Sequence, residues 1–282
     1  MSLVFETASP VTQADPNRAD VACFIGFVAR RPGRPLPDVL RAQLVAASWA
    51  GAGIWTKPAQ QIESLENLPV SLDSWDLFAE LFAWDARPLA ADGSSQCATY
   101  LGAAVRSFFA RGGRRAIVIR VGDPWPFLES GARRATLRRQ RMRRMLPDFA
   151  DRDAPEYPFE PHNPARWQGI HHLYGLRENS LLVLPDLVDV CTFEPPLPDV
   201  TLVPPPAPEG FVECSSDEPV DVDMGLRHVP APRLDSRGYA AWQLAVAAAR
   251  DFLANWQREV VLLAALPLPN LDTQRVTPEV ME

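Results

Sequence analysis

Hydrophobic residues follow two repeating patterns along the chain, and each pattern predicts a different kind of element. Apolar residues spaced three and four positions apart predict helices at 73–82, 100–111, 129–146, 166–178 and 235–257, with part of 38–55 also helical. Short continuous apolar runs predict buried strands at 21–33, 70–72, 116–121, 179–187 and 260–269. Helices that alternate with such strands indicate an α/β layered core, in which helices flank a largely parallel sheet.

Three of the predicted helices have a recognisable start, stop or buried face. The helix after residue 72 should begin with Asp73 as its N-cap. The helix of 100–111 should end at a left-handed glycine, either Gly112 or Gly113. The expected buried residues of the three helices are Leu77, Phe78, Leu81 and Phe82 in the first, Leu101, Ala104, Val105 and Phe108 in the second, and Trp242, Val246, Ala249, Leu253 and Trp256 in the last.

The helix predicted at 129–146 carries seven arginines between Arg133 and Arg144. Its apolar stripe is narrow, formed by Ala135, Met142 and Leu146, which predicts a surface helix. Three interpretations stay open for its charge: contact with nucleic acid, pairing with an acidic neighbouring subunit, or simple solvation. The candidate donors for a subunit interface are Arg138, Arg141 and Arg144.

Proline and acidic residues divide the chain into segments. Residues 1–20 have the composition of an extended N-terminal arm, and 21–193 hold the first part of the core. Residues 194–232 are rich in proline and acid and predict an insertion loop. The last helix and strand of the core follow at 233–270, and 271–282 form a C-terminal tail.

Composition and charge exclude several classes of protein. The chain has 282 residues, is 47% hydrophobic and carries a formal net charge of −7, which argues against binding a polyanion by bulk charge. The four cysteines form no closely spaced pair, which is typical of reduced, mostly buried thiols and predicts cytoplasmic folding. No secretion signal or membrane span is expected. Lys57 is the only lysine.

Motifs for catalysis are weak. Neither "GAGIWT" nor "RGGRRA" has the order of a phosphate-binding loop, and no GxSxG elbow is present. A metal cluster would need His162, His171 and His172 to converge, whereas adjacent histidines on a helix point in different directions. We expect one histidine to be packed and the others to be in solvent. No catalytic residue, cofactor site or metal site is predicted.

The stretch "YLGAAVRSFFARGGRRAIVIRV", residues 100–121, resembles the signature of contractile tail sheath proteins of phages and injection systems. The segments "RADVACFIGFVARRPG", "PVSLDSWDLFAELF", "NSLLVLPDL" and "YAAWQLAVAAARDFLANWQREVVLLAALPLP" are similar to other parts of that family's α/β core, whose topology is subtilisin-like. The residues of 100–121 that we take as the structural signature are Tyr100, Arg106, Phe108, Phe109, Gly112, Gly113 and Arg114.

The resemblance implies a non-enzymatic structural subunit that polymerises around an inner tube and contracts. The implied partners are copies of the chain or sister sheath subunits, the tube protein, and baseplate or terminal cap proteins, with no nucleic acid. Assembly is expected in the cytoplasm, with release in an extracellular phage-like particle. Family members normally continue into a C-terminal domain, so a fragment or a minor end-specific component stays open as an alternative. A hydrolase-like enzyme on the same core, acting through Ser215 and His172, is the other alternative.

Overall fold

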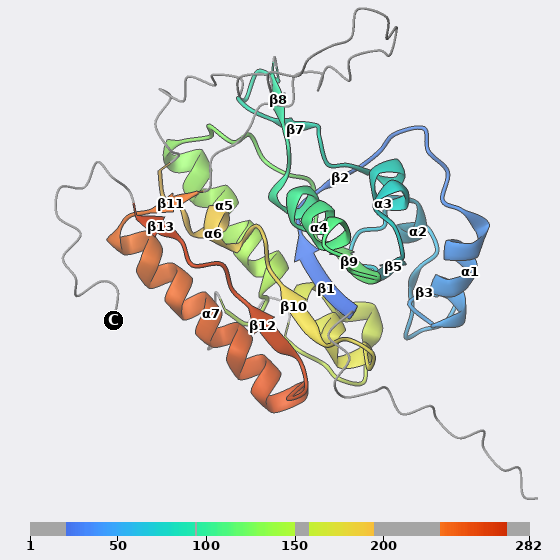
Figure 1. Cartoon of the computed structure of the whole chain (residues 1–282). Helices are drawn as coiled ribbons and strands as arrows, with labels where there is room; N and C mark the ends of the chain where they lie inside the picture. The colour runs from blue at the N-terminus through green and yellow to red at the C-terminus, as the bar shows by residue number, and fades with distance from the viewer. Residues whose placement is uncertain (1–20, 94, 150–157, 195–231, 270–282) are drawn as a thin grey trace, which may run out of the picture.

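A five-stranded sheet organises the fold. The computed structural model describes residues 21–93, 95–149, 158–194 and 232–269. The strands lie in the order β12-β10-β1-β9-β5, and all pair in parallel except β5, which is antiparallel to β9 (Figure 1). Their bounds are β1 Val21–Gly26, β5 Val70–Leu72, β9 Arg115–Arg120, β10 Leu181–Val183 and β12 Val261–Leu263. The predicted α/β fold with a largely parallel sheet is therefore confirmed.

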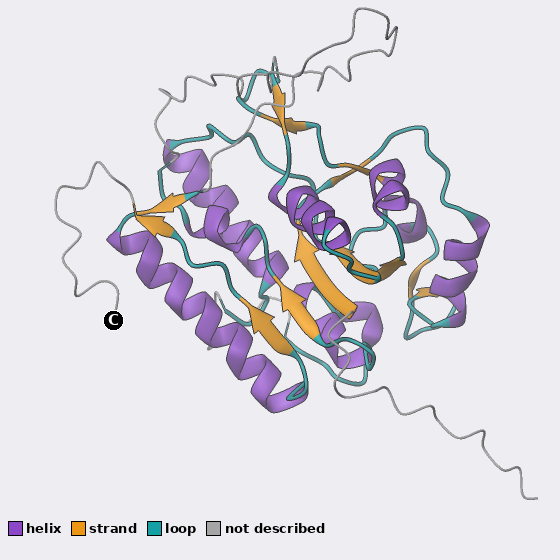
Figure 2. Ribbon diagram, viewed as in Figure 1, coloured by secondary structure: helices purple, strands orange, loops and turns teal. Residues whose placement is uncertain are grey.

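Helices pack on both faces of this sheet (Figure 2). Alternate residues of β1 point to opposite faces, so Cys23 and Ile25 enter one core and Ala22 and Phe24 the other. The first core contains residues of α5, α6 and α7, and the second contains residues of α1, α3 and α4. The helices are α1 Asp38–Ala46, α2 Gln61–Ser64, α3 Trp75–Leu81, α4 Tyr100–Ala110, α5 Gly131–Met145, α6 Leu187–Cys191 and α7 Ser236–Trp256, with 3-10 turns η1 Pro164–Arg166 and η2 Gly169–Gly175.

Short two-residue strands form pairs around the core. These pairs connect loops and lie outside the main sheet. They are β2 Ala29–Arg30 with β6 Phe82–Ala83, β3 Ala50–Gly51 with β4 Lys57–Pro58, β7 Arg87–Pro88 with β8 Gln96–Cys97, and β11 Arg233–Leu234 with β13 Leu268–Pro269.

Three predicted elements differ from the structure. Ser74, rather than Asp73, caps α3, because its hydroxyl oxygen accepts the N–H of Leu77. The strand predicted over 21–33 ends at Gly26, since the chain turns away after it and forms only the short β2. The helix predicted at 166–178 is the short 3-10 turn η2.

Two predictions of burial near the C-terminal side of the core were wrong. The strand expected to be buried at 260–269 is β12, which lies at the edge of the sheet and exposes alternate side chains. Trp256, expected on the buried face of α7, is 43% exposed. The ring of Trp256 lies edge-on to those of Phe159 and Tyr174 and belongs to neither core cluster.

Some predicted segments lie outside the described residues. These are the arm at 1–20, nearly all of the insertion loop and the tail at 271–282. Cys23, Cys97 and Cys191 are buried free thiols, as expected, while Cys214 lies in the part that is not described. None of the helices described here is both long and apolar enough to span a membrane.

Candidate functional site

The turn between α4 and β9 holds the signature residues. The helix begins at Thr99, whose hydroxyl oxygen accepts the N–H of Gly102 at 3.1 Å. It ends before Gly112, which has a φ of +86°. The N–H groups of Gly112 and Gly113 donate to the carbonyl oxygens of Phe109 and Phe108, so the helix's last turn is satisfied. The predicted left-handed glycine is therefore Gly112.

Gly113 is needed for a different reason: the ring of Phe108 leaves no space for a side chain at this position. A Cβ atom at Gly113 would lie 2.4 Å from Cε1 of that ring. The ring packs edge-on against Phe24 of β1, with 5.4 Å between centroids, and against Phe109 at 5.5 Å. The second glycine thus lets the end of α4 fold down onto the central strands.

The other signature residues also make packing contacts. The guanidinium carbon of Arg106 lies 5.6 Å from the ring centre of Trp84 and 5.9 Å from that of Trp75. Tyr100 stands in the first turn of α4, with the guanidinium of Arg87 5.5 Å from its ring centre. Arg114 is exposed. The contacts of Arg106 and Tyr100 hold α4 against neighbouring elements, while a direct role of the signature residues in assembly stays a prediction.

The arginine-rich helix α5 is not the uniform surface helix that the sequence predicted. Ala135, expected in its apolar stripe, is exposed, whereas Arg134 is buried together with Met142 and Met145. Arg134 can be buried because its guanidinium finds acceptors inside the protein. Its Nε donates to the carbonyl oxygen of Thr192 at 3.0 Å.

Arg134 belongs to a buried cluster centred on Asp189 of α6. Oδ2 of Asp189 accepts from Nη2 of Arg87 at 2.7 Å, and Oδ1 accepts from Nη2 of Arg134 at 3.3 Å. All three side chains are only 2% exposed. Nε of Arg87 also donates to the carbonyl oxygen of Trp125 at 3.0 Å. The cluster therefore joins β7, α5 and α6. Loss of any member would leave a buried charge without its partner.

A second buried carboxyl group, Asp186, lies where β1 and β10 end. Its Oδ2 accepts the N–H of Phe27 at 2.9 Å. A Cβ atom at Gly26 would lie 2.2 Å from the same oxygen, so only glycine allows this approach. Burial raises the pKa of Asp186 to about 7 from an ordinary value of 3.8. In open α/β sheets, ligands commonly bind at the carboxyl ends of the strands.

The protein's own side chains pack over this carboxyl end. Arg141 places its guanidinium carbon 4.9 Å from the ring centres of both Phe27 and Trp125, and it donates to the carbonyl oxygen of Asp123. Burial lowers the pKa of Arg141 to about 10. This packing occupies the position at which such folds present ligands.

All three arginines proposed as interface donors make contacts within the chain. Besides Arg141, Arg144 pairs with Oε1 of Glu66 at 3.1 Å and donates to the carbonyl oxygen of Val121 at 3.3 Å. The guanidinium carbon of Arg138 lies 3.6 Å from the ring centre of Phe193. Participation in an interface would therefore require them to share or exchange these partners.

The three candidate histidines, all within the described residues, are arranged differently from the prediction: His171 and His172 are both buried, and His162 is exposed. Both ring nitrogens of His172 face backbone carbonyl oxygens, those of Gly169 at 3.0 Å and Asn67 at 2.9 Å. Burial, helped by the charge of Lys57, lowers its pKa to about 3. Within the described ranges, no three His, Cys, Asp or Glu side chains converge as metal ligands.

The enzyme alternative gains no support from these positions. Ser215 lies outside the described residues. The ring of His172 is engaged by the backbone, and Nε2 of His171 lies 2.9 Å from Oδ2 of Asp148. A base needs a reachable nucleophile beside it, and neither histidine is placed against one by a described contact.

Lys57, the sole lysine, is also buried, with 3% of its surface exposed. Its Nζ donates to the carbonyl oxygens of Trp167 at 2.7 Å and Ala165 at 3.2 Å. Burial lowers its pKa to about 8. The amine therefore ties the β3–β4 loop to η1.

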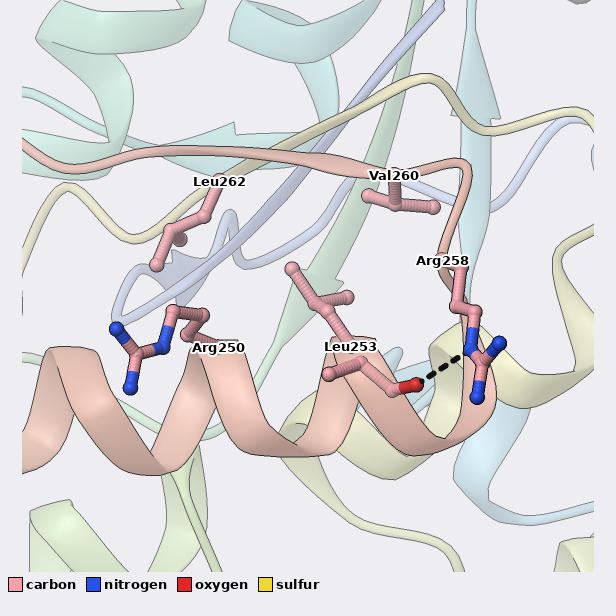
Figure 3. A pocket seen from close by; sticks show the side chains of 6 residues that line it. Arg250, Leu253, Arg258, Val260 and Leu262 are labelled. Atoms are coloured by element: carbon pink, nitrogen blue, oxygen red, sulfur yellow. Dashed lines mark hydrogen bonds between the residues drawn. The ribbon is translucent and has the colours of Figure 1, made fainter.

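The edge strand β12 forms the least covered part of the sheet. Val261 is 57% exposed and Leu263 47%. Among the described strands, none pairs with its outer edge. A groove of about 460 Å³ separates β12 from α7 (Figure 3); its lining residues are Leu253, Ala254, Val260 and Leu262, with Arg250 and Arg258. This end of the molecule offers apolar surface and unpaired strand backbone together, which is a typical site for contact with another chain.

Sequence reasoning missed the buried carboxyl groups Asp186 and Asp189 and their partner Arg87. The only available signal was the "LPDLVDV" stretch, in which an apolar strand runs straight into two acidic residues three positions apart. Such residues commonly face solvent. Comparison of the chain with protein-family models, curated proteins and solved structures returned no match.

Proposed function

We propose that the chain is a structural subunit of a contractile sheath, of the kind found in injection systems and phage-like tails. In this function it polymerises with copies of itself or with sister subunits around an inner tube. The supporting sequence evidence is the resemblance of residues 100–121 to the sheath signature. The observation that carries the proposal is the open end of the sheet at β12, where apolar side chains and strand backbone lack cover within the described residues.

The rigidity of the core suits such a function. A contracting sheath passes between two lattices, so the free energy of contraction must come from interfaces rather than from deformation of the subunits. The buried pairing of Asp189 with Arg87 and Arg134 joins three elements on one side of the sheet. The glycine turn fixes α4 on the other side. We expect the subunit to move as one body.

The β12 edge is suited to receive a strand from a neighbouring subunit. Main-chain hydrogen bonds would link the two chains, and the groove beside α7 would take alternate side chains of the added strand. The segment predicted to be an extended arm, residues 1–20, would supply such a link in a neighbour. No cofactor is required for this function. Assembly would take place in the cytoplasm before release of the particle.

The test is high-speed sedimentation of native lysate, followed by electron microscopy of the pellet and quantitative mass spectrometry. Recovery in rod-shaped particles, at copy numbers comparable to those of a tube protein, would support a main sheath subunit. A few copies per particle would support an end-specific component instead. If particles form while the chain stays in the supernatant as a monomer, the proposal is wrong.

A further inference from the structure

Among the residues that the structure describes, one face of the sheet is covered at its centre and bare at one end. Parallel pairing places Phe24, Val183 and Leu263 in one row across β1, β10 and β12. Along this row Phe24 is buried, Val183 is half-buried, and Leu263 is 47% exposed. The neighbouring row, Ala22, Leu181 and Val261, follows the same gradient.

The gradient follows from where the covering helix lies. Leu101 and Val105 of α4 share a core with Ala22 and Phe24, whereas β10 reaches that core only through half-buried side chains. In Figure 2, no described helix lies in front of β10 and β12. Parallel sheets are normally covered on both faces by helices. The bare end therefore has the shape and apolar character of a site for one more helix.

The opposite end of the molecule carries a helix with an apolar outer face. α1 lies beside β5, at the far side of the sheet from β12 (Figure 1). Its inner face buries Leu40 and Leu44. Its outer face presents Val39, 69% exposed, and Val45, 50% exposed, on either side of the exposed Ala42 and Ala46.

This outer face differs from that of an ordinary surface helix, which is polar. The charged residues of α1 are Asp38 at its first position and Arg41, which pairs with Glu63 at 2.6 Å. Gln43 is the exposed polar residue of the helix, and the rest of the outer surface consists of the small and β-branched side chains of Val39, Ala42, Val45 and Ala46. Small residues allow a helix backbone to approach a flat apolar surface closely.

We propose that the outer face of α1 in one copy packs on the bare β10–β12 face of the next copy. This inference rests on the proposed function and names the contact through which the core polymerises. The sizes agree: nine helical residues span about 13 Å, and three strand residues about 10 Å. Because the two surfaces lie at opposite ends of one molecule, the contact is head-to-tail and repeats from copy to copy.

The available area sets the strength of the contact. Each face presents only a few exposed apolar side chains, so the area they bury should fall below the roughly 1,200 Å² at which stable binary complexes begin. A single contact should therefore be weak, so that the purified chain is monomeric when dilute and associates as its concentration rises. A lattice that adds further contacts at each subunit would stabilise it.

The experiment uses sedimentation velocity of the purified full chain over a wide concentration range. Val45→Glu blocks only the helix face, and Val261→Lys blocks only the sheet face. Both positions are exposed, so the monomer should stay folded, which circular dichroism checks. We expect each variant to raise the apparent dissociation constant tenfold or more. Arg139→Glu, an exposed change on α5, is the matched control and should leave association unchanged.

Mixing the two variants tests the head-to-tail arrangement. The Val45→Glu copy retains its sheet face and the Val261→Lys copy retains its helix face, so the mixture should form dimers and no larger species. Polymers in the mixture, or a self-association unaffected by either change, would overturn the inference. Loss of association in only one variant would also overturn it, because that face would then bind another partner or another segment of the chain.

The two proposals fail in distinguishable ways. If the wild-type chain is found in sheath particles and both variants still assemble normally, the contact is wrong and the function stands. If the chain is absent from particles while the purified protein associates through these two faces, the function is wrong and the contact stands.

Discussion

The N–H of Phe27 donates to Oδ2 of Asp186 at 2.9 Å across 159 residues of sequence. This bond fastens the carboxyl end of β1 to that of β10, at the middle of the sheet. The carboxyl group is buried, and burial raises its pKa to about 7. A group of this kind makes the stability of the core depend on pH.

The sign of that dependence follows from proton binding. Between about pH 4 and pH 7 the folded protein holds a proton on Asp186 that the unfolded chain releases, so this group's stabilising contribution is lost as pH rises through that range. Asp186→Asn mimics the neutral form and should remove a decline of up to about 1.4 kcal/mol per pH unit. Urea denaturation from pH 4 to pH 8 measures it. Asp251→Asn, an exposed change, is the control, and an unaltered slope in Asp186→Asn would contradict the prediction.

Two arginines of α5 should differ strongly in the stability lost on the same substitution. Arg134→Met leaves Asp189 with one partner fewer in the interior, and we expect a loss of about 3 kcal/mol in the free energy of unfolding. Arg139→Met, at an exposed position of the same helix, should change stability by less than about 0.5 kcal/mol. Guanidinium denaturation of the two variants gives the comparison. Equal effects would mean that Arg134 is not part of a buried cluster.

The glycine pair after α4 should show two separate requirements. Gly112→Val places a β-branched residue at a φ of +86° and should leave little soluble protein, whereas Gly112→Asn should retain most of the stability because asparagine tolerates this conformation. Soluble yield and melting temperature distinguish them. A stable, soluble Gly112→Val protein would show that the turn is not under this constraint.

Gly113→Ala introduces a clash with the ring of Phe108. Its cost should be about 1–3 kcal/mol, and Phe108→Leu should reduce that cost by making room. A double-mutant cycle measured by thermal unfolding reports the coupling. Additive effects of the two changes would contradict the proposed contact.

Charge reversal should destabilise the monomer much more at Arg141 than at Arg144, although both are predicted interface arginines. Arg141→Glu would bring a carboxylate beside Asp123 and Asp186 and should destabilise the monomer by about 2 kcal/mol or more. Arg144→Glu disrupts a partly exposed pair with Glu66 and should cost less than about 1 kcal/mol. Only Arg144→Glu can therefore test a role in assembly cleanly, through particle yield. Similar melting temperatures for the two variants would contradict this separation.

The hydrophobic patterns of the sequence predicted the fold class because a continuous apolar run indicates a strand that is buried on both faces. β1 and β9 are continuous apolar runs in the centre of the sheet, and both were anticipated. The same reasoning failed for β12, because an apolar run cannot show whether a neighbouring strand or helix exists to cover it. The bare face of that strand is a property of the tertiary arrangement.

Buried polar groups were beyond prediction for a related reason. Arg134 and Arg139 are the same residue type five positions apart on one helix, yet one is buried and the other exposed. The difference depends on Asp189, more than fifty residues away, and on the carbonyl oxygen of Thr192. Such distant acceptors cannot be predicted from the local sequence. The end of α4 at Gly112 could be predicted, because it depends only on residues of the same helix and turn.

The burial of Lys57 shields the only lysine side chain of the folded protein from amine-directed reagents. Because the only lysine donates to two backbone carbonyl oxygens in the interior, amine-directed acylating or crosslinking reagents meet no lysine side chain on the folded surface. Modification of Lys57 must wait until the loop carrying β3 and β4 separates from η1. The labelling rate of this single residue would thus report how often this loop opens locally.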